Sequence, residues 1–309
     1  MTPDRRILVL APIPPELRAR LQASYELVEY RREAGAPLPP APGFRVAVTT
    51  SVAGADKAML AALPDLGLLA CNGTGLDQID MDEATRRGIL VRHTPDVVTE
   101  DTADFAIGLM YAASRRIAEA DRFVRAGRWG RERMTPSRRL YDKRLGIVGL
   151  GRIGAAIARR AAGIGMTVSY TGPRPKPEAH FPFVPDIGEL AEAVDVLVLS
   201  CPGGASTRHI VDAAVLRRLG PDGILVNVSR GSVVDEDALV AALQDGTIAG
   251  AGLDVFAAEP ELDARFLTLE NAVLQPHYAA VTRETRGAMA DLLDRAIGAF
   301  LADPGRVRL

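Results

Sequence analysis

Short runs of valine, isoleucine and leucine alternate with amphipathic stretches along most of the chain. Such runs are typical of strands buried on both faces of a parallel sheet, and the stretches between them of covering helices. In the first third, strands are expected at residues 7–10, 25–28, 46–49, 68–71 and 89–92, with helices at 14–22, 56–63 and 81–87. Alternating strands and helices close into a parallel sheet through right-handed crossovers, which predicts an α/β fold.

The pattern changes near residue 95. Residues 99–126 predict one long helix, because apolar positions recur along them and Glu100 and Asp101 suit a helix N-terminus. The arginine-rich stretch that follows predicts a surface loop, as do two proline-rich stretches, and residues 282–309 predict a last helix. The loops are expected at 127–143, 36–42 and 173–185, and a second series of strands at 145–148, 167–170, 196–199, 224–228, 249–253 and 273–274.

Composition narrows the class of protein. A length of 309 residues favours two domains, and 48% hydrophobic residues are enough for a sizeable core. Thirty-seven basic against 39 acidic residues give no electrostatic footprint for nucleic acid or an anionic membrane. No apolar run approaches the roughly 20 residues of a membrane span, and the run near the start is too short for a signal peptide. A cytoplasmic protein is therefore expected.

The two cysteines, Cys71 and Cys201, each close an apolar run and are expected to be buried thiols without a disulfide. No histidine has metal-ligand spacing to another histidine or to a cysteine, so no metal site is expected. His93, His180 and His209 are interpreted as structural or surface residues.

The strongest local motif is Gly149-Leu150-Gly151-Arg152-Ile153-Gly154, which follows an apolar strand and opens an alanine-rich helix. In that context the motif predicts dinucleotide binding. The first glycine allows a tight turn, the second lets the backbone approach the pyrophosphate, and the third lets helix pack on strand. The helix N-terminus favours the negative charge of the pyrophosphate. The alternative is a strand–turn–helix whose glycines serve packing only.

The end of the next strand bears on the choice of cofactor. An NAD site usually has Asp or Glu there for the ribose 2′-hydroxyl, and this chain has Ser169-Tyr170-Thr171-Gly172-Pro173-Arg174 instead. The hydroxyls of Ser169 and Thr171 are candidates to bind a 2′-phosphate, and Arg174, with Lys176, to pair with its charge. NADPH is therefore expected in preference to NADH, which stays possible; the alternative for the two cations is a solvated loop.

Three ionisable residues follow strand-like runs in the second half of the chain: Arg230, Glu259 and His277. In an open α/β sheet, ligands bind outside the carboxyl ends of the strands, so these side chains are expected to converge there. Each taken singly has another interpretation. Arg230 suits a helix-capping charge, Glu259 a turn residue before Pro260, and His277 an interdomain packing residue.

Together these motifs resemble the D-isomer-specific 2-hydroxyacid dehydrogenase family. The residues that carry the resemblance are 149–154, 227–231, 250–256, 259–260 and 276–277, with 72–80 and 94–97 near the start, so it covers nearly the whole chain. Within the family, residues 170–175 and 99–129 are most similar to NADPH-preferring glyoxylate/hydroxypyruvate reductases and hydroxyphenylpyruvate reductases.

The resemblance implies two doubly wound parallel-sheet domains. A Rossmann-type cofactor domain, residues 99–279, is inserted in a flavodoxin-like substrate domain of residues 1–98 and 280–309, with the active site in the cleft between them. It also implies a homodimer. Trp129 is then a candidate to cap the partner's active site, with ordinary loop packing the alternative.

The resemblance also assigns roles. Reduction of a 2-oxo acid needs a hydride at the carbonyl carbon, a proton at its oxygen and a cation for the carboxylate. His277 would be the general acid, Glu259 would orient and charge its ring, and Arg230 would hold the carboxylate and polarise the carbonyl. Backbone N–H groups of Thr74 and Gly75 would bind the substrate carboxylate. Further cofactor contacts are implied at Arg152, Ile153, Cys201, Pro202, Thr207, Val228 and Asp254, the last with the nicotinamide carboxamide.

The chain departs from the family after its histidine. Tyr278-Ala279-Ala280 stands where many members have Gly-Ser, so one hydroxyl near the substrate is missing and a preference for glyoxylate is in doubt. Two other functions remain open at this point. One is an NAD-dependent dehydrogenase that works oxidatively, and the other is a nucleotide-sensing interaction protein similar to the transcriptional co-repressors that resemble this family.

Overall fold

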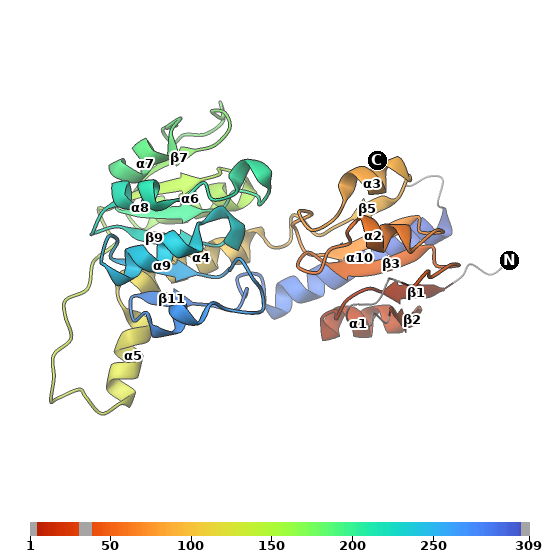
Figure 1. The fold of residues 1–309 in the computed structure, drawn as a ribbon, viewed down its shortest axis with the longest axis horizontal. Helices are drawn as coiled ribbons and strands as arrows, with labels where there is room; N and C mark the ends of the chain where they lie inside the picture. Colours follow the sequence, from red (N-terminus) through yellow and green to blue (C-terminus); the bar gives the residue numbers. More distant parts are fainter. Residues whose placement is uncertain (1–4, 31–38, 304–309) are drawn as a thin grey trace. The chain divides into compact units, whose positions relative to one another are not determined.

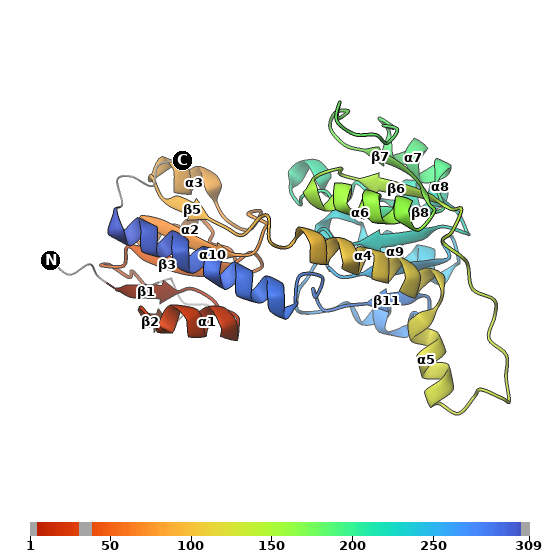
Figure 2. The same cartoon turned by 180° about the vertical axis from the view of Figure 1, so that it is seen from behind.

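The computed structural model describes residues 5–30 and 39–303, which form two compact units. Unit 1 contains the described residues up to Val98 and those from Val281 onward, and unit 2 is Thr99–Ala280. Figures 1 and 2 show each unit as a sheet with helices on both faces. The roles expected for the two units, substrate binding and cofactor binding, stay predictions.

Unit 1 is built on a five-stranded sheet in the order β2-β1-β3-β4-β5, and every strand pair in it is parallel. This order is that of flavodoxin-like folds. Its elements are β1 (Arg6–Val9), α1 (Pro15–Gln22), β2 (Glu26–Glu29), β3 (Val46–Thr50), α2 (Lys57–Ala61), β4 (Leu68–Asn72), α3 (Met81–Arg86), β5 (Leu90–Arg92) and α10 (Arg283–Ala302).

Alternate residues of these strands enter two different cores. Ile7, Val48 and Ala70 pack with α1 and α10 on one face of the sheet. Their neighbours Ala47 and Leu69 pack with α2 and α3 on the other face. The apolar runs are therefore continuous because both sides of each strand are buried.

Unit 2 contains a six-stranded sheet in the order β11-β10-β9-β8-β6-β7, again parallel throughout. Its strands are β6 (Arg144–Val148), β7 (Thr167–Thr171), β8 (Val196–Leu199), β9 (Ile224–Asn227), β10 (Gly250–Leu253) and β11 (Ala272–Leu274). Its helices are α4 (Thr99–Ser114), α5 (Ile117–Arg125), α6 (Arg152–Gly163), α7 (Ile187–Ala193), α8 (Ala213–Leu219) and α9 (Glu236–Gln244), with short 3-10 turns η1 (Ala205–Thr207), η2 (Gly231–Val233) and η3 (Ala264–Thr268).

A parallel bridge between Tyr170 and Phe183 adds a one-residue third strand outside β7. With it, the order from that edge is third, second, first, fourth, fifth and sixth, which is the Rossmann order, and β11 follows. Helices α4 and α6 cover one face of this sheet and α7, α8 and α9 the other. The expected α/β class with two doubly wound parallel sheets is confirmed.

The expectation of one helix over residues 99–126 is wrong. α4 ends at Ser114 and α5 begins at Ile117, because Arg116 adopts a left-handed conformation with φ of 53°. The guanidinium of Arg116 then bonds both carboxylate oxygens of Glu119 at 2.5 and 2.6 Å. No glycine or proline lies at the break, so the sequence does not indicate that the helix ends there.

Two other expectations differ in part. The last helix ends at Ala302 rather than near the end of the chain, and residues 304–309 lie outside the described residues, as do residues 36–38 of the first proline-rich loop. Beyond α4, helix α5 and the loop after it extend away from the body of unit 2 in both views (Figures 1 and 2). Among the described residues, no helix is long and apolar enough to cross a membrane.

Candidate active site

The glycine motif forms the turn from β6 into α6. Gly149 has φ of 93°, and a Cβ there would lie 2.7 Å from the Cα of Cys201. A Cβ on Gly154 would lie 2.2 Å from the carbonyl oxygen of Gly149. Only glycine fits either position, because one needs a left-handed conformation and both lie against backbone. The first and third glycines therefore bring strand, turn and helix together.

The middle glycine leaves open space. Gly151 is the exposed N-cap of α6, and nothing lies within 4 Å of where its Cβ would be. The first turn of α6 begins at Arg152 with no side chain capping its N–H groups. A helix N-terminus without a side-chain cap, next to open space at Gly151, fits the pyrophosphate of a dinucleotide.

The end of β7 differs from what the sequence suggested for hydroxyl groups. Thr171 is buried, and its hydroxyl donates to the carbonyl oxygen of Pro185 at 3.3 Å. Ser169 lies within β7, paired with Gly146. Arg174 is exposed and makes no hydrogen bond or ion pair among the described residues, whereas Lys176 is half-buried and its backbone amide donates to the Tyr170 hydroxyl at 2.7 Å. Of the four side chains, Arg174 is the most available for a phosphate.

Other expected cofactor contacts follow β8 and β9 at the same edge. Cys201 lies against Gly149 and is buried, and burial raises the pKa of its thiol to about 11. The Thr207 hydroxyl donates to the carbonyl oxygen of Pro202 at 2.8 Å, which ties that loop together. Val228, directly after β9, is also buried. The Cys201 thiol is therefore neutral at ordinary pH and forms an apolar surface beside the glycine turn.

Arg230 is placed by a side-chain turn after β9. The Asn227 amide donates to the carbonyl oxygen of Arg230 at 2.9 Å, and its own oxygen accepts from the amide and hydroxyl of Ser229. In the sequence, Asn227 stands out only as the first residue of the 227–231 motif. The sequence pattern that could have revealed its role is an asparagine that ends an apolar strand three residues before an arginine. In the structure this asparagine is buried.

Glu259 and His277, expected to converge, do so. The Nδ1 atom of His277 lies 2.6 Å from Oε2 of Glu259, and the two side chains are 33% and 18% exposed. The other carboxylate oxygen, Oε1, accepts the Phe256 amide at 2.9 Å. The ring is held by one nitrogen, and Nε2 has no partner among the described residues. This is the arrangement expected of a histidine that exchanges a proton with a ligand.

The charge state of Glu259 follows from the same contacts. Burial alone would raise the pKa of its carboxyl. The hydrogen bond from His277, the charge of His277, the Phe256 amide and the charge of Arg230 together outweigh burial and hold the pKa below its usual value. Glu259 is therefore an anion at neutral pH, and Arg230 is near enough to act on it.

Asp254 fixes the backbone around His277. Its carboxylate is 1% exposed and accepts the amides of Tyr278 at 2.6 Å and Ala279 at 3.0 Å. Its carbonyl oxygen accepts the His277 amide at 2.9 Å. His277 has φ of 54°, a left-handed conformation that few residues other than glycine adopt and that the surroundings must hold. Desolvation raises the pKa of Asp254 against the opposing effect of these amides.

Thr74 and Gly75 lie in unit 1, in the turn after β4. The Thr74 carbonyl oxygen is 2.9 Å from Nδ1 of His93, and the Thr74 hydroxyl donates to the carbonyl oxygen of Thr94. The amide N–H groups of Thr74 and Gly75 donate to no group among residues 5–30 and 39–303. They are thus available to an anion, although their role stays a prediction.

Three further features lie away from this set. A cavity of about 540 Å³ sits at the opposite, amino edge of the unit 2 sheet, beside Ile224 and Ala272, so it is not the candidate site. Trp129 is 77% exposed on the loop after α5. Within the part of the chain that the structure describes, no group of acidic, histidine or cysteine residues could hold a metal ion.

The carboxyl edge of an open parallel sheet is where nicotinamide-dependent oxidoreductases bind their cofactor, and unit 2 has the topology, the glycine turn and the acid–base pair of such an enzyme. Residues 107–279 match the family model of the NAD-binding domain of D-isomer-specific 2-hydroxyacid dehydrogenases. This match covers more than half of the chain.

Relatives agree with the family model over nearly the full length. A 2-ketogluconate reductase of Gluconobacter oxydans is 43% identical over 96% of this chain and 96% of its own. A hydroxyphenylpyruvate reductase of Plectranthus scutellarioides is 40% identical over 93% of each chain. The crystal structure of an NADPH-dependent glyoxylate/hydroxypyruvate reductase of Sinorhizobium meliloti, in complex with NADP and malonate, superposes with a TM-score of 0.87 at 40% identity, covering 97% of this chain and 94% of that one. The chain belongs to the D-isomer-specific 2-hydroxyacid dehydrogenase family, and it is an NAD(P)-dependent enzyme of that family.

Proposed function

We propose that this enzyme reduces a small 2-oxo acid to the D-2-hydroxy acid with NADPH, and that His277, Glu259 and Arg230 carry the reaction. The observation that carries the proposal is the 2.6 Å contact between His277 and Glu259, beside the charge of Arg230. Relatives named as reductases of 2-ketogluconate, hydroxyphenylpyruvate and glyoxylate or hydroxypyruvate support the substrate class.

His277 is the proton donor in this mechanism. Its Nδ1–H donates to Glu259, which fixes the orientation of the ring, and Nε2 carries the proton that goes to the substrate's carbonyl oxygen. The Phe256 amide holds Glu259, and Asp254 holds the backbone around His277. The ring therefore keeps its orientation during proton transfer. Glu259 stays ionised throughout.

Arg230 binds the substrate's carboxylate and polarises its carbonyl. A guanidinium presents a planar fork of donors that matches a carboxylate, and its charge stabilises the oxygen as negative charge develops there. The amides of Thr74 and Gly75 are proposed to bind the same carboxylate. The group beyond C2 is not specified by these residues, although Ala279 and Ala280 after Tyr278 favour a substrate that needs no hydroxyl there.

The reduced nicotinamide, when bound, supplies the hydride for the carbonyl carbon. Gly151 and the first turn of α6 are proposed to hold the pyrophosphate, with Arg152, Ile153, Cys201, Pro202, Thr207 and Val228 beside it and Asp254 toward the carboxamide. The preference for NADPH rests on the missing acid at the end of β7 and on exposed Arg174. The Sinorhizobium meliloti relative described with NADP supports it.

Replacing the proposed acid tests the mechanism. His277→Ala is expected to lower kcat at least about a hundredfold, the scale of general acid catalysis, while NADPH binds nearly as in the unchanged protein. His180→Ala, an exposed histidine on a loop, is the matched control and should leave both values unchanged. If His277→Ala loses NADPH binding and turnover equally, the residue is structural and the mechanism fails.

Replacing Arg174 tests the cofactor preference. Arg174→Ala should weaken NADPH binding about tenfold or more, because a charge-assisted contact to the 2′-phosphate is lost, and should leave NADH binding unchanged. Arg217→Ala, which removes an exposed arginine from the last turn of α8, is the control. An equal effect on NADH and NADPH would remove the 2′-phosphate interpretation.

A panel of 2-oxo acids with NADPH and NADH side by side separates the alternatives. NADPH oxidation with several members supports reduction; turnover only of D-2-hydroxy acids with NAD points to an oxidative enzyme; binding of dinucleotide without turnover points to an interaction protein.

We also propose a homodimer. Ile117 and Val124 on α5 and Trp129 beyond it are 52%, 51% and 77% exposed, and a solution mass near twice 32.9 kDa would support their burial by a second copy.

A further inference from the structure

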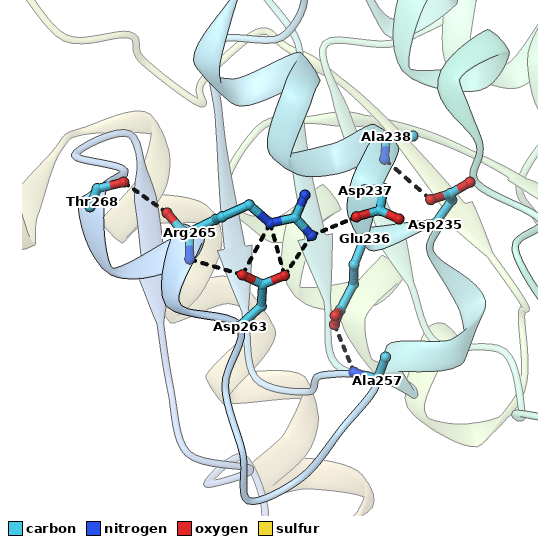
Figure 3. Close-up of polar contacts among 8 residues, drawn as sticks. All are labelled: Asp235, Glu236, Asp237, Ala238, Ala257, Asp263, Arg265 and Thr268. Carbon is cyan, nitrogen blue, oxygen red and sulfur yellow. Dashed lines mark hydrogen bonds and ion pairs between the residues drawn. The ribbon is translucent and has the colours of Figure 1, made fainter.

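The backbone of Phe256 and Ala257, two successive residues, lies beside the acid–base pair and is held from three sides. On the inner side, the Phe256 amide donates to Oε1 of Glu259 at 2.9 Å. On the outer side, the Ala257 amide donates to Oε1 of Glu236 at 2.7 Å, as Figure 3 shows. Glu236 and Glu259 therefore accept hydrogen bonds from the backbone amides of two successive residues.

The third side is Gly231, the residue after Arg230. A Cβ at Gly231 would lie 1.9 Å from the carbonyl carbon of Phe256 and 2.3 Å from the Ala257 nitrogen. No side chain fits there, so the backbone that carries Arg230 packs directly on this peptide bond. A displacement of the peptide would therefore alter both Glu259 and the approach of the Arg230 segment.

The loop is also fastened further along. Arg265 bonds Asp237 at 2.5 Å and Asp263 at 2.5 Å, which joins the loop after Ala257 to the first turn of α9 (Figure 3). These side chains are largely exposed, and exposed ion pairs contribute little. The Glu236 contact differs because its carboxylate is half-buried and acts on the segment next to Glu259.

We propose that Glu236 is a positioning residue for catalysis: its carboxylate holds the Phe256–Ala257 peptide so that the Phe256 amide orients Glu259 toward His277. This inference rests on the roles proposed above for Glu259 and His277. No hydrogen bond or ion pair joins Glu236 to either residue among the described residues, and it lies 23 positions before Glu259 and 41 before His277, so its effect passes through the backbone of Phe256.

The surroundings of Glu236 indicate that its oxygen atom matters more than its charge. Burial raises the pKa of its carboxyl, the Ala257 amide opposes this, Asp263 and Asp237 raise it further, and Arg265 lowers it. A carboxylate in that position is not favoured by its environment as an anion. What it supplies is an acceptor at the right reach from the helix, and a neutral amide oxygen of the same length would do the same.

Three substitutions of Glu236 separate these features. Glu236→Gln keeps an acceptor oxygen at the same reach and loses the charge. Glu236→Asp keeps the charge and falls one methylene short of the Ala257 amide. Glu236→Ala loses both. Glu189→Ala, which removes an exposed acid from the first turn of α7, is the matched control for the helix N-terminus.

We expect Glu236→Asp and Glu236→Ala to lower kcat about tenfold with KM for the 2-oxo acid changed less than about twofold, because small displacements of a catalytic group are costly. The downfield proton signal of the His277–Glu259 bond, assigned by its loss in His277→Asn, should weaken in both. Glu236→Gln and Glu189→Ala should match the unchanged enzyme in all three measurements.

The results are decisive in either direction. Unchanged kcat and proton signal in Glu236→Asp overturn the inference, as does a Glu236→Gln enzyme that is as impaired as Glu236→Ala. If Glu236→Ala does not fold, the Asp and Gln variants still give the comparison. These outcomes are separate from those of the proposed function, which fails if His277→Ala keeps its turnover or loses turnover and NADPH binding equally.

Discussion

The two sheets carry the same short pattern at their carboxyl edges. Gly73-Thr74-Gly75 follows β4 in unit 1, and Gly149-Leu150-Gly151 follows β6 in unit 2. In both, the first glycine has a positive φ, 146° and 93°, and packs on the residues that follow the neighbouring strand. A Cβ on Gly73 would lie 2.2 Å from the Ser51 hydroxyl, and one on Gly149 would meet Cys201.

The difference lies in where the next helix begins. α6 starts at Arg152, directly after Gly151, and its N-cap has no side chain. α3 starts only at Met81, and its N-cap Asp80 accepts the Glu83 amide. The turn in unit 2 thus presents a bare helix N-terminus, whereas the turn in unit 1 presents single amides. A Gly-x-Gly turn therefore suits a dinucleotide only when an uncapped helix opens at its second glycine.

The largest effect is expected from a side chain placed where the glycine turn packs against α6. Gly154→Ala should weaken NADPH binding roughly 10- to 100-fold, because its Cβ would lie 2.2 Å from the Gly149 carbonyl oxygen and the turn must move. Gly163→Ala in the same helix meets nothing within 4 Å and should bind NADPH normally. Isothermal titration measures both; equal affinities would show that the helix N-terminus does not set binding.

The sequence predicted the features that depend on local chemistry. Buried parallel strands, the glycine turn and the three ionisable residues each leave a pattern within a few positions, so both sheets and the meeting of Glu259 with His277 were anticipated. The Asn227 and Asp254 contacts were less visible, because a side chain that accepts backbone amides looks like any strand-end polar residue until the turn is known.

Features that depend on a distant partner were missed. The α4–α5 break at Arg116 carries no glycine or proline, and the residues around it include helix formers; it shows only in three dimensions, where Arg116 also reaches the Thr135 carbonyl oxygen. Glu236 reads as an ordinary first-turn acid, since its partner Ala257 is 21 positions away. The Thr171 hydroxyl, a candidate for phosphate, is taken by Pro185 in a loop whose path the sequence does not fix.

A smaller effect is expected when the corresponding glycine turn of unit 1 is altered. Gly73→Ala forces a Cβ against Ser51 at a φ that alanine rarely adopts, so the amides of Thr74 and Gly75 should shift. We expect KM for the 2-oxo acid to rise about tenfold, one lost carboxylate contact, with NADPH affinity unchanged. Gly88→Ala, which has φ of 68° but nothing within 4 Å, controls for backbone strain alone. A change in NADPH affinity instead of KM would contradict the separate roles.

The acid–base pair distinguishes the edge of unit 2 by its pH dependence. Because the folded pKa of Glu259 is held below its usual value, the pair contributes stability that is present above about pH 4.3 and lost as pH falls through the lower folded pKa. Glu259→Gln should melt roughly 2–4 °C below the unchanged protein at pH 6, with the gap closing toward pH 3. Scanning calorimetry at both pH values measures it, and a gap that stays constant would remove the ionised carboxylate as its cause.

The smallest effect separates stability from catalysis in the two units. Asp56 caps α2 in unit 1 by accepting the Met59 amide, and Asp235 caps α9 in unit 2 by accepting the Ala238 amide. Replacing either by alanine should cost about 1 kcal/mol of stability, because each frees one helix N–H. Only Asp235→Ala should also lower kcat, by about twofold, because α9 carries Glu236, and a looser first turn misplaces its carboxylate by a fraction of an ångström. Urea unfolding and steady-state kinetics on both variants measure the pair, and an equal loss of kcat in Asp56→Ala would mean that the first turn of α9 has no particular connection to the acid–base pair.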